Sequence, residues 1–131
     1  MRFDRFIQTL DMGKCEDQLQ RQALFDLVLF LVVVDGVITD SEADFMHKWL
    51  ETLEWNSVIT KDDYYNTTLI KCYDAIEKNT AEDFLTHRAK QLVDQEIKKE
   101  AMKLVRDIAS VDGELDKSEK KSIAILSELL E

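Results

Sequence analysis

The pattern of apolar and polar positions along the chain is helical from one end to the other. Apolar residues recur every three or four positions in several stretches that short polar segments separate. These stretches are residues 2–11, 16–34, 41–54, 60–76, 80–92, 94–111 and 118–130. The chain has no proline and only three glycines, which disfavours strands and tight hairpins. The sequence therefore predicts an all-α protein, a single-domain bundle of about seven helices.

A short acidic phrase occurs twice, each time after an apolar stretch. Residues 34–42 read VDGVITDSE, and residues 111–119 read VDGELDKSE, 77 positions further on. A repeat at a constant offset is the mark of a duplicated structural unit. We predict one domain, residues 1–131, whose halves (roughly 16–55 and 94–131) are related by an internal pseudo-two-fold repeat.

The repeat decides the conformation of the most apolar segment. Residues 27–34 read LVLFLVVV and could form a buried strand, because valine is β-branched. The equivalent residues of the second half place their apolar side chains on one stripe of a helix: Ile97, Ala101, Leu104, Val105 and Ile108. Equivalent parts of a duplicated unit should share a conformation. Both segments are therefore predicted to be helices, and the first should be the central, most enclosed one.

The glycine and the glutamate of each phrase have structural explanations. A helix commonly ends on a residue in the left-handed conformation, which glycine adopts without a Cβ clash, so Gly36 and Gly113 are predicted to end the preceding helices. Each glutamate falls three residues after a potential N-cap, where its carboxylate can reach back to the N–H group of that cap. These predicted pairs are Thr39 with Glu42 and Asp116 with Glu119.

Asp35 and Asp112 need a further explanation. Each stands at the C-terminal end of a helix, where the helix dipole disfavours a negative charge by roughly 0.3–1 kcal/mol. One explanation is local, because an Asp side chain can accept hydrogen bonds from N–H groups of the following turn. The other is a divalent cation such as Ca²⁺ or Mg²⁺, held by the Asp, by the Glu seven residues later and by carbonyl oxygens. The residues alone leave both alternatives open.

The phrases match only the second half of the calcium-binding loop of EF-hands. The first and third ligand positions of that loop would be Leu31 and Val33 in the first copy and Ile108 and Ser110 in the second. Aliphatic side chains cannot bind a cation, so an EF-hand is not predicted.

The chain resembles the TerB-like proteins. The resemblance lies in an apolar helix, a DG turn and an acidic helix start, an arrangement that is repeated near the end of the chain. That family is associated with tellurite resistance and stress response, and it includes the N-terminal domain of DnaJ-type co-chaperones anchored in membranes. The resemblance covers nearly the whole chain and implies an all-helical, pseudo-symmetric fold. It also implies divalent-metal binding at the turns, by Asp35, Glu42, Asp112, Glu119, Asp40 and Asp116. The two ligand sets would differ, because Lys117 stands where the first copy has Asp40.

Charge and cysteine content limit the kinds of binding partner and the cellular compartment that we expect. A formal net charge of −10 disfavours binding to nucleic acid or to an anionic membrane surface. Cys15 and Cys72 form no CxxC pair and are expected to be free thiols in a reducing cytoplasm. The first residues lack the apolar segment of a signal peptide, and the apolar run 27–34 is shorter than the roughly 20 residues of a membrane span. We expect a cytoplasmic protein without direct membrane insertion.

No catalytic motif is recognisable, and we do not expect an enzyme. The chain lacks HExxH and GxSxG motifs and a glycine-rich phosphate loop, and His47 and His87 lie on separate predicted helices. The alternative to a metal-binding module is a metal-independent helical adaptor of the co-chaperone type that binds protein partners. Its binding surface would be the basic stretch from Arg88 to Arg106, or an aromatic cluster of Trp55, Tyr64 and Tyr65. The sequence does not define an oligomeric state.

Overall fold

Seven α-helices make up the part of the chain that the computed structural model describes, residues 3–12, 17–110 and 115–131. They are α1 (Asp4–Ile7), α2 (Gln18–Val33), α3 (Asp40–Glu51), α4 (Lys61–Glu77), α5 (Ala81–Gln91), α6 (Gln95–Ala109) and α7 (Lys117–Leu130). These residues contain no strand, so the predicted all-α class is confirmed. The internal two-fold repeat stays a prediction.

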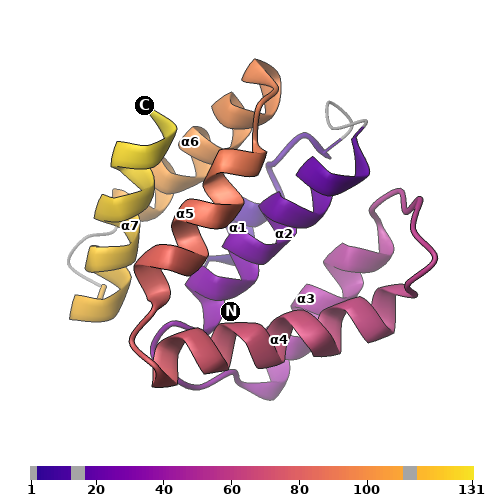
Figure 1. The fold of residues 1–131 in the computed structure, drawn as a ribbon, viewed down its shortest axis with the longest axis horizontal. Helices are drawn as coiled ribbons and strands as arrows, with labels where there is room; N and C mark the ends of the chain where they lie inside the picture. The colour runs from indigo at the N-terminus through magenta and orange to yellow at the C-terminus, as the bar shows by residue number, and fades with distance from the viewer. Residues whose placement is uncertain (1–2, 13–16, 111–114) are drawn as a thin grey trace.

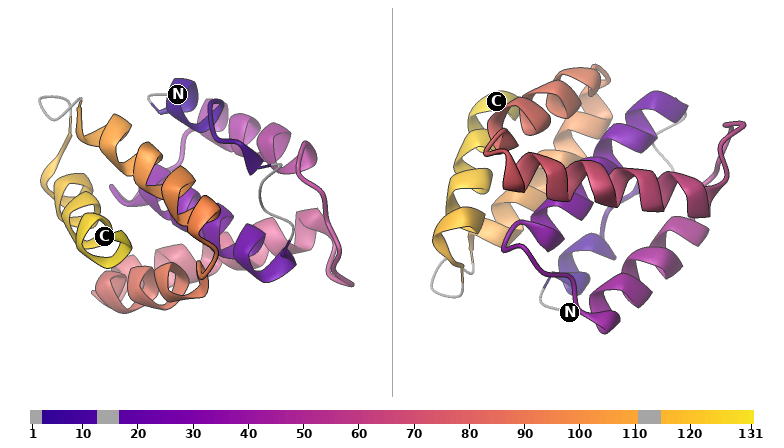
Figure 2. Two further views of the ribbon diagram at one scale, coloured as in Figure 1. Left: turned by 90° about the horizontal axis from the view of Figure 1, so that it is seen from above. Right: turned by 60° about the horizontal axis from the view of Figure 1, so that its bottom comes forward.

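Helix α2 is the centre of the fold. It crosses the middle of the molecule, with α5, α6 and α7 on one side and α3 and α4 on the other (Figure 1). It packs against α3, α4 and α5, and nearly all of its side chains are buried. A helix that is apolar on every side is stable only when neighbours enclose it, as was predicted for this segment. Helices α6 and α7 pack side by side, and α1 lies against α6 (Figure 2).

The N-terminal helix is much shorter than the predicted 2–11. After Ile7 the backbone continues in tighter turns, with the Leu10 N–H group donating to the Ile7 carbonyl oxygen at 3.1 Å. Side chains of α6 then form hydrogen bonds with the backbone of Thr9 and Asp11. The Glu100 carboxylate accepts from the Asp11 N–H group at 2.9 Å, and Lys103 Nζ donates to the Thr9 carbonyl oxygen at 2.7 Å. These tertiary hydrogen bonds compete with the helical ones and end α1 early.

Helix starts agree with the sequence at most positions. Thr60 followed three residues later by Asp63 predicts a capping box from the sequence, and Thr60 Oγ1 does accept from the Asp63 N–H group at 3.2 Å at the start of α4. From the sequence, Thr80 followed by Asp83 predicts a cap for α5 of the same kind, but the Thr80 side chain makes no capping hydrogen bond, so this prediction is wrong. The preceding Asn79 has a left-handed backbone with φ 59°, and the Thr80 N–H group donates to the Ala75 carbonyl oxygen at 2.8 Å. This tight turn leaves Thr80 outside the extended conformation that a capping hydroxyl needs.

No helix in the described ranges has both the length and the apolar character required to cross a membrane.

Candidate functional site

The first acidic turn follows α2 directly. The Gly36 N–H group donates to the Val33 carbonyl oxygen at 2.8 Å, and Gly36 has φ 95°, in the left-handed region. Asp35 Oδ1 accepts from the Val37 N–H group at 3.1 Å. The aspartate thus has the local hydrogen bond that one of the two explanations requires. Gly36 has the predicted backbone conformation, although α2 ends slightly earlier, at Val33.

Both predicted capping boxes are present. Glu42 Oε1 accepts from the Thr39 N–H group at 3.0 Å, while Thr39 Oγ1 accepts from the Glu42 N–H group at 3.2 Å. In the second copy Glu119 Oε1 accepts from the Asp116 N–H group at 3.1 Å, and Asp116 Oδ1 accepts from the Glu119 N–H group at 2.8 Å. Asp40, the first residue of α3, is exposed. Helix capping therefore occupies three of the six residues predicted to bind metal: Glu42, Asp116 and Glu119.

Tyr73 of α4 lies next to the first turn. Burial raises the pKa of its hydroxyl group, and the negative charges of Asp35 and Glu42 raise it further, while a hydrogen bond with the Ile38 backbone lowers it. The structure thus brings Asp35 and Glu42 to the same bend. Asp112 lies outside the described residues. Among residues 3–12, 17–110 and 115–131, no group of three or more His, Cys, Asp or Glu side chains could hold a metal ion.

Metal binding at the turns stays a prediction with a direct test. If the turns bind Ca²⁺, Mg²⁺, Mn²⁺ or Zn²⁺, the cation should stabilise the fold by RT ln(1 + [L]/Kd), about 2.7 kcal/mol at one hundred times Kd. Thermal melts with each cation measure this, and the double variant Asp35→Asn/Asp112→Asn should lose the effect. An unchanged Tm for every cation would leave helix capping and the Asx turn as the roles of these residues.

Gly36 offers a test of the turn itself. A Cβ atom added at Gly36 meets nothing within 4 Å, so any cost of Gly36→Ala comes from the backbone conformation alone. With φ at 95°, we expect a loss of about 1–2 kcal/mol in the free energy of unfolding. Gly36→Asn should cost less, because asparagine tolerates the left-handed region. Urea denaturation measures both, and equal stability of the alanine variant and the parent would contradict this account.

The predicted basic stretch does not form one face. Lys103 is bound to the Thr9 carbonyl oxygen, and Arg88 lies on α5, where it faces α2 and α4. Three other cations of the stretch, Lys98, Lys99 and Arg106, line a shallow groove of about 230 Å³ between α6 and the end of α7. This α6–α7 groove is lined by Gln95, Lys98, Lys99, Met102, Arg106, Leu130 and Glu131.

The predicted aromatic surface patch is wrong. Tyr65 is only 3% exposed, and the His47 ring packs on it with centroids 3.9 Å apart. Trp55 is half-buried, donates from Nε1 to the Ile59 carbonyl oxygen at 2.7 Å and meets Tyr64 edge-on. Burying an aromatic ring removes a large apolar area from water, so these rings pack against the core. Their neighbours Val58 and Ile59 are exposed instead.

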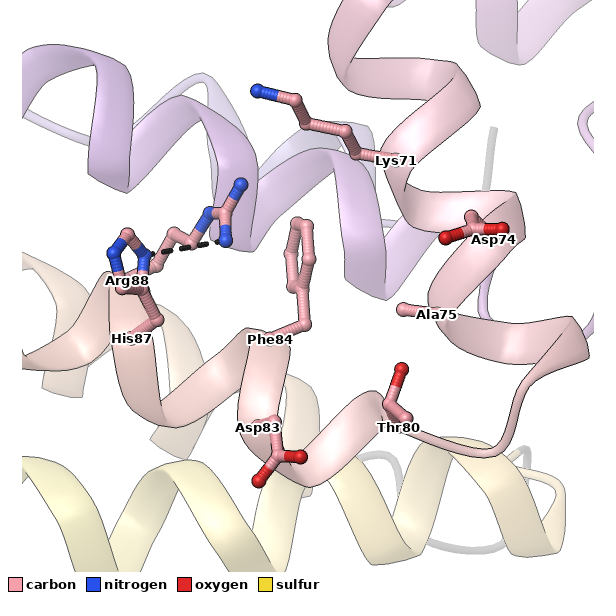
Figure 3. A pocket seen from close by; sticks show the side chains of 8 residues that line it. All are labelled: Lys71, Asp74, Ala75, Thr80, Asp83, Phe84, His87 and Arg88. Atoms are coloured by element: carbon pink, nitrogen blue, oxygen red, sulfur yellow. Dashed lines mark hydrogen bonds between the residues drawn. The ribbon is translucent and has the colours of Figure 1, made fainter.

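A second groove, of about 440 Å³, lies between α4 and α5. Its lining combines three basic side chains, two carboxylates, a hydroxyl group and two apolar side chains. In that order they are Lys71, His87, Arg88, Asp74, Asp83, Thr80, Ala75 and Phe84. In Figure 3 the Phe84 ring stands between Arg88 and His87 on one side and Ala75 and Thr80 on the other. We call this the α4–α5 groove.

Arg88 is held in the α4–α5 groove by a carboxylate of the central helix. Its Nε donates to Asp26 Oδ2 at 3.1 Å, and its guanidinium lies over the Phe84 ring, 4.0 Å from the centroid. Asp26 Oδ1 accepts a 2.5 Å hydrogen bond from the Tyr64 hydroxyl group. Arg88 Nη1 lies 3.2 Å from His87 Nδ1. Three helices thus fix one guanidinium group at the wall of the groove.

Burial governs the titration of this cluster. Burial raises the pKa of Asp26 above its ordinary value of 3.8, while the hydrogen bonds from Tyr64 and Arg88 and the charge of Arg88 act in the opposite direction. Burial likewise raises the pKa of Tyr64, and the charge of Asp26 adds to that increase. A carboxylate inside a protein is tolerated only with such partners. The cluster therefore behaves as one unit in which each member depends on the others.

Sequence reasoning did not find Asp26, although a signal was present. Asp26 is a single carboxylate in a helix that is otherwise apolar from Ala23 to Val34. Buried carboxylates are rare unless paired, so a lone one at such a position indicates a buried partner. Cys72 is also buried, and burial raises the pKa of its thiol far above its ordinary range, which makes it unreactive. Cys15 lies outside the described residues.

Comparisons of the chain with protein-family models, with curated proteins and with solved structures found no match. The described residues form an all-α fold with polar grooves on its surface, and the resemblance to TerB-like proteins stays a prediction.

Proposed function

We propose that the protein is a non-catalytic helical interaction module that binds a protein partner in the α4–α5 groove. The recognised segment carries an acidic group, which pairs with Arg88, and a basic group close to it. The stress-response setting implied by the TerB-like resemblance, including tellurite resistance, is part of the proposal. This is the adaptor alternative of the sequence analysis, with a different binding surface.

The position of Arg88 is the observation that carries this proposal. Its Nε is used by Asp26 and its face by Phe84, so the guanidinium group is oriented before any ligand arrives. An arginine ordered in this way loses little conformational entropy on binding a carboxylate, and its remaining N–H groups match the geometry of that anion. Exposed Lys71 adds a second positive charge on the same side of the α4–α5 groove.

The carboxylates of the groove set the second requirement. Asp74 and Asp83 are both exposed, and Asp74 forms an ion pair with Lys78 at 3.2 Å. A purely anionic ligand would be repelled by them, whereas a segment with an acidic and a basic group matches both sides. The groove volume of about 440 Å³ lies within the range of about 300–1,000 Å³ that is typical of ligand sites.

The experiment is an NMR titration of the ¹⁵N-labelled protein with three blocked tripeptides, EGK, QGK and EGQ. We expect EGK to shift the amide resonances of α4 and α5 at the lowest concentration, because only EGK matches both charges. Lys71→Gln should weaken EGK binding several-fold without affecting the fold, since Lys71 is exposed.

Lys48→Gln is the matched control. Lys48 is an exposed lysine of α3, away from the lining of the groove, and its loss should leave EGK binding unchanged. Equal shifts with all three peptides, or equal weakening by both lysine variants, would contradict recognition in the α4–α5 groove. Those outcomes would indicate general attraction between opposite charges.

A further inference from the structure

Two surfaces of the molecule have complementary chemistry and cannot meet within one copy. One is the α3–α4 loop, residues 52–60, which protrudes on the right in Figure 1, away from α6 and α7. The other is the α6–α7 groove. We propose that the protein associates head to tail with a second copy of itself, with the α3–α4 loop of one copy in the α6–α7 groove of the next.

The tip of the α3–α4 loop is apolar. Val58 is fully exposed at 101%, and the next residue, Ile59, is 48% exposed. Leu19, at the start of α2, is exposed at the same end of the molecule, since the adjacent Gln18 accepts through Oε1 from the Asn56 N–H group at 2.8 Å. Single exposed apolar side chains are ordinary, but a group of them at one end is typical of an interface.

The loop is also held in one conformation by its own contacts. Trp55 Nε1 donates to the Ile59 carbonyl oxygen at 2.7 Å, and the Ile59 N–H group donates to Ser57 Oγ at 3.2 Å. The Trp55 ring packs against Tyr64 with centroids 5.1 Å apart. A loop that is ordered before association loses little further entropy when it is covered, which favours its use as a docking element.

Negative charge surrounds the apolar tip. Exposed carboxylates flank the loop on both sides: Glu51, Glu54, Asp62 and Asp63. The nearby cations balance this charge only in part. Lys61 Nζ donates to the Glu51 carbonyl oxygen at 3.1 Å, and Arg21 is buried, with Nη2 3.9 Å from Glu54 Oε2. A partner surface should therefore be apolar at its centre and positively charged at its edge.

The α6–α7 groove carries positive charge from Lys98, Lys99 and Arg106, together with one carboxylate, Glu131. Its apolar part comes from Met102 and Leu130, which are 9% and 6% exposed. Lys99 is drawn toward Glu96 only weakly, with Nζ and Oε1 4.0 Å apart. The volume of about 230 Å³ suits a small apolar tip rather than a large ligand.

Net charge supports this one orientation. Two copies with a charge of −10 repel each other, and a contact between the cationic groove and the acidic loop offsets this repulsion. The α3–α4 loop lies on the other side of the molecule from α6 and α7, which line the groove (Figure 2). Because the loop and the groove are different surfaces, the contact is heterologous and leaves a free loop and a free groove on every chain of copies. The association should be open-ended, dependent on concentration and weakened by salt.

The test is sedimentation velocity of the whole protein over a range of concentrations, in low salt and in about 0.5 M NaCl, where screening extends over only a few ångströms. We expect larger species in low salt that decline in high salt. Val58→Asp and Lys98→Glu/Arg106→Glu should each give monomers, because each removes one of the two surfaces. The controls are Ile70→Asp, an exposed apolar position on α4, and Lys48→Glu/Lys117→Glu, and both should associate like the parent.

Mixing the two defective proteins separates this proposal from a symmetric dimer. The Val58→Asp protein keeps a working groove, and the Lys98→Glu/Arg106→Glu protein keeps a working loop, so an equimolar mixture should form heterodimers and nothing larger. A monomeric parent protein at all concentrations, association that both variants retain, or a mixture that stays monomeric would each overturn the proposal. A parent that stays monomeric would leave these surfaces to a different partner.

Discussion

Replacing Arg88 with methionine should lower the free energy of unfolding by about 3–5 kcal/mol at neutral pH, because it leaves a buried carboxylate without its cation. The side chain of Asp26 is 7% exposed and that of Arg88 15%, so water cannot take over the lost contact. Tyr64 alone would remain as a partner in hydrogen-bond range of Asp26. Urea denaturation followed by circular dichroism measures the loss.

The pH dependence of that loss identifies its cause. The folded-state pKa of Asp26 is above its ordinary value of 3.8, and removal of Arg88 should raise it further. A carboxyl group with a raised folded-state pKa favours the fold fully below its unfolded-state pKa, and this contribution is lost as the pH rises through the folded-state pKa. The deficit of Arg88→Met should therefore shrink as the pH falls from neutral toward about pH 4.

A double variant supplies the control. Asp26→Leu/Arg88→Met replaces both charges with apolar groups of similar size. It should therefore recover most of the stability that Arg88→Met alone loses relative to the unmodified protein. If the double variant is as unstable as Arg88→Met alone, the lost packing of the arginine stem on Phe84, and not the unpaired charge, is responsible. A deficit that does not change with pH would lead to the same conclusion.

Phe25→Ala should have an effect of similar size, about 3–5 kcal/mol, through loss of packing. Phe25 is completely buried on α2, and its ring contacts the rings of Trp49, Tyr64 and Tyr65 at centroid distances of 5.7, 6.1 and 6.5 Å. These rings join α2 to α3 and α4, so the cavity would form where three helices meet. Chemical denaturation and thermal melts measure the loss.

Leu19→Ala is the matched control on the same helix. Leu19 is 65% exposed, and its truncation should change the free energy of unfolding by less than about 0.5 kcal/mol. A small effect of Phe25→Ala would mean that the surrounding helices close the cavity, and the central position of α2 would then not explain the stability of the fold.

The helices themselves follow from local information. The seven predicted segments match α1 to α7, with α1 much shorter, because apolar spacing and capping residues act within a few positions. The capping boxes at Thr39 and Asp116 and the left-handed backbone of Gly36 were predictable for the same reason. Helix α2 was predicted to be central because only a surrounded helix can be apolar on all sides.

The grooves were not predictable in this way. Asp26 is separated from Tyr64 by 38 positions and from Arg88 by 62, and no local pattern relates them. Only the packing of α4 and α5 on α2 brings these side chains together. The basic stretch shows the reverse case, since residues that are close in the sequence, Arg88 and Lys98, end up in different grooves.

The helices, most of their caps and the enclosed position of α2 follow from the order of the residues, because hydrophobic periodicity and backbone hydrogen bonding act over short distances along the chain. Tertiary structure alone decided which polar side chains meet. The packing of the helices pairs Asp26 with Arg88, buries Tyr65 and separates the basic residues. The physical reason is that a charged side chain meets its partners through contacts between helices that are far apart in the sequence.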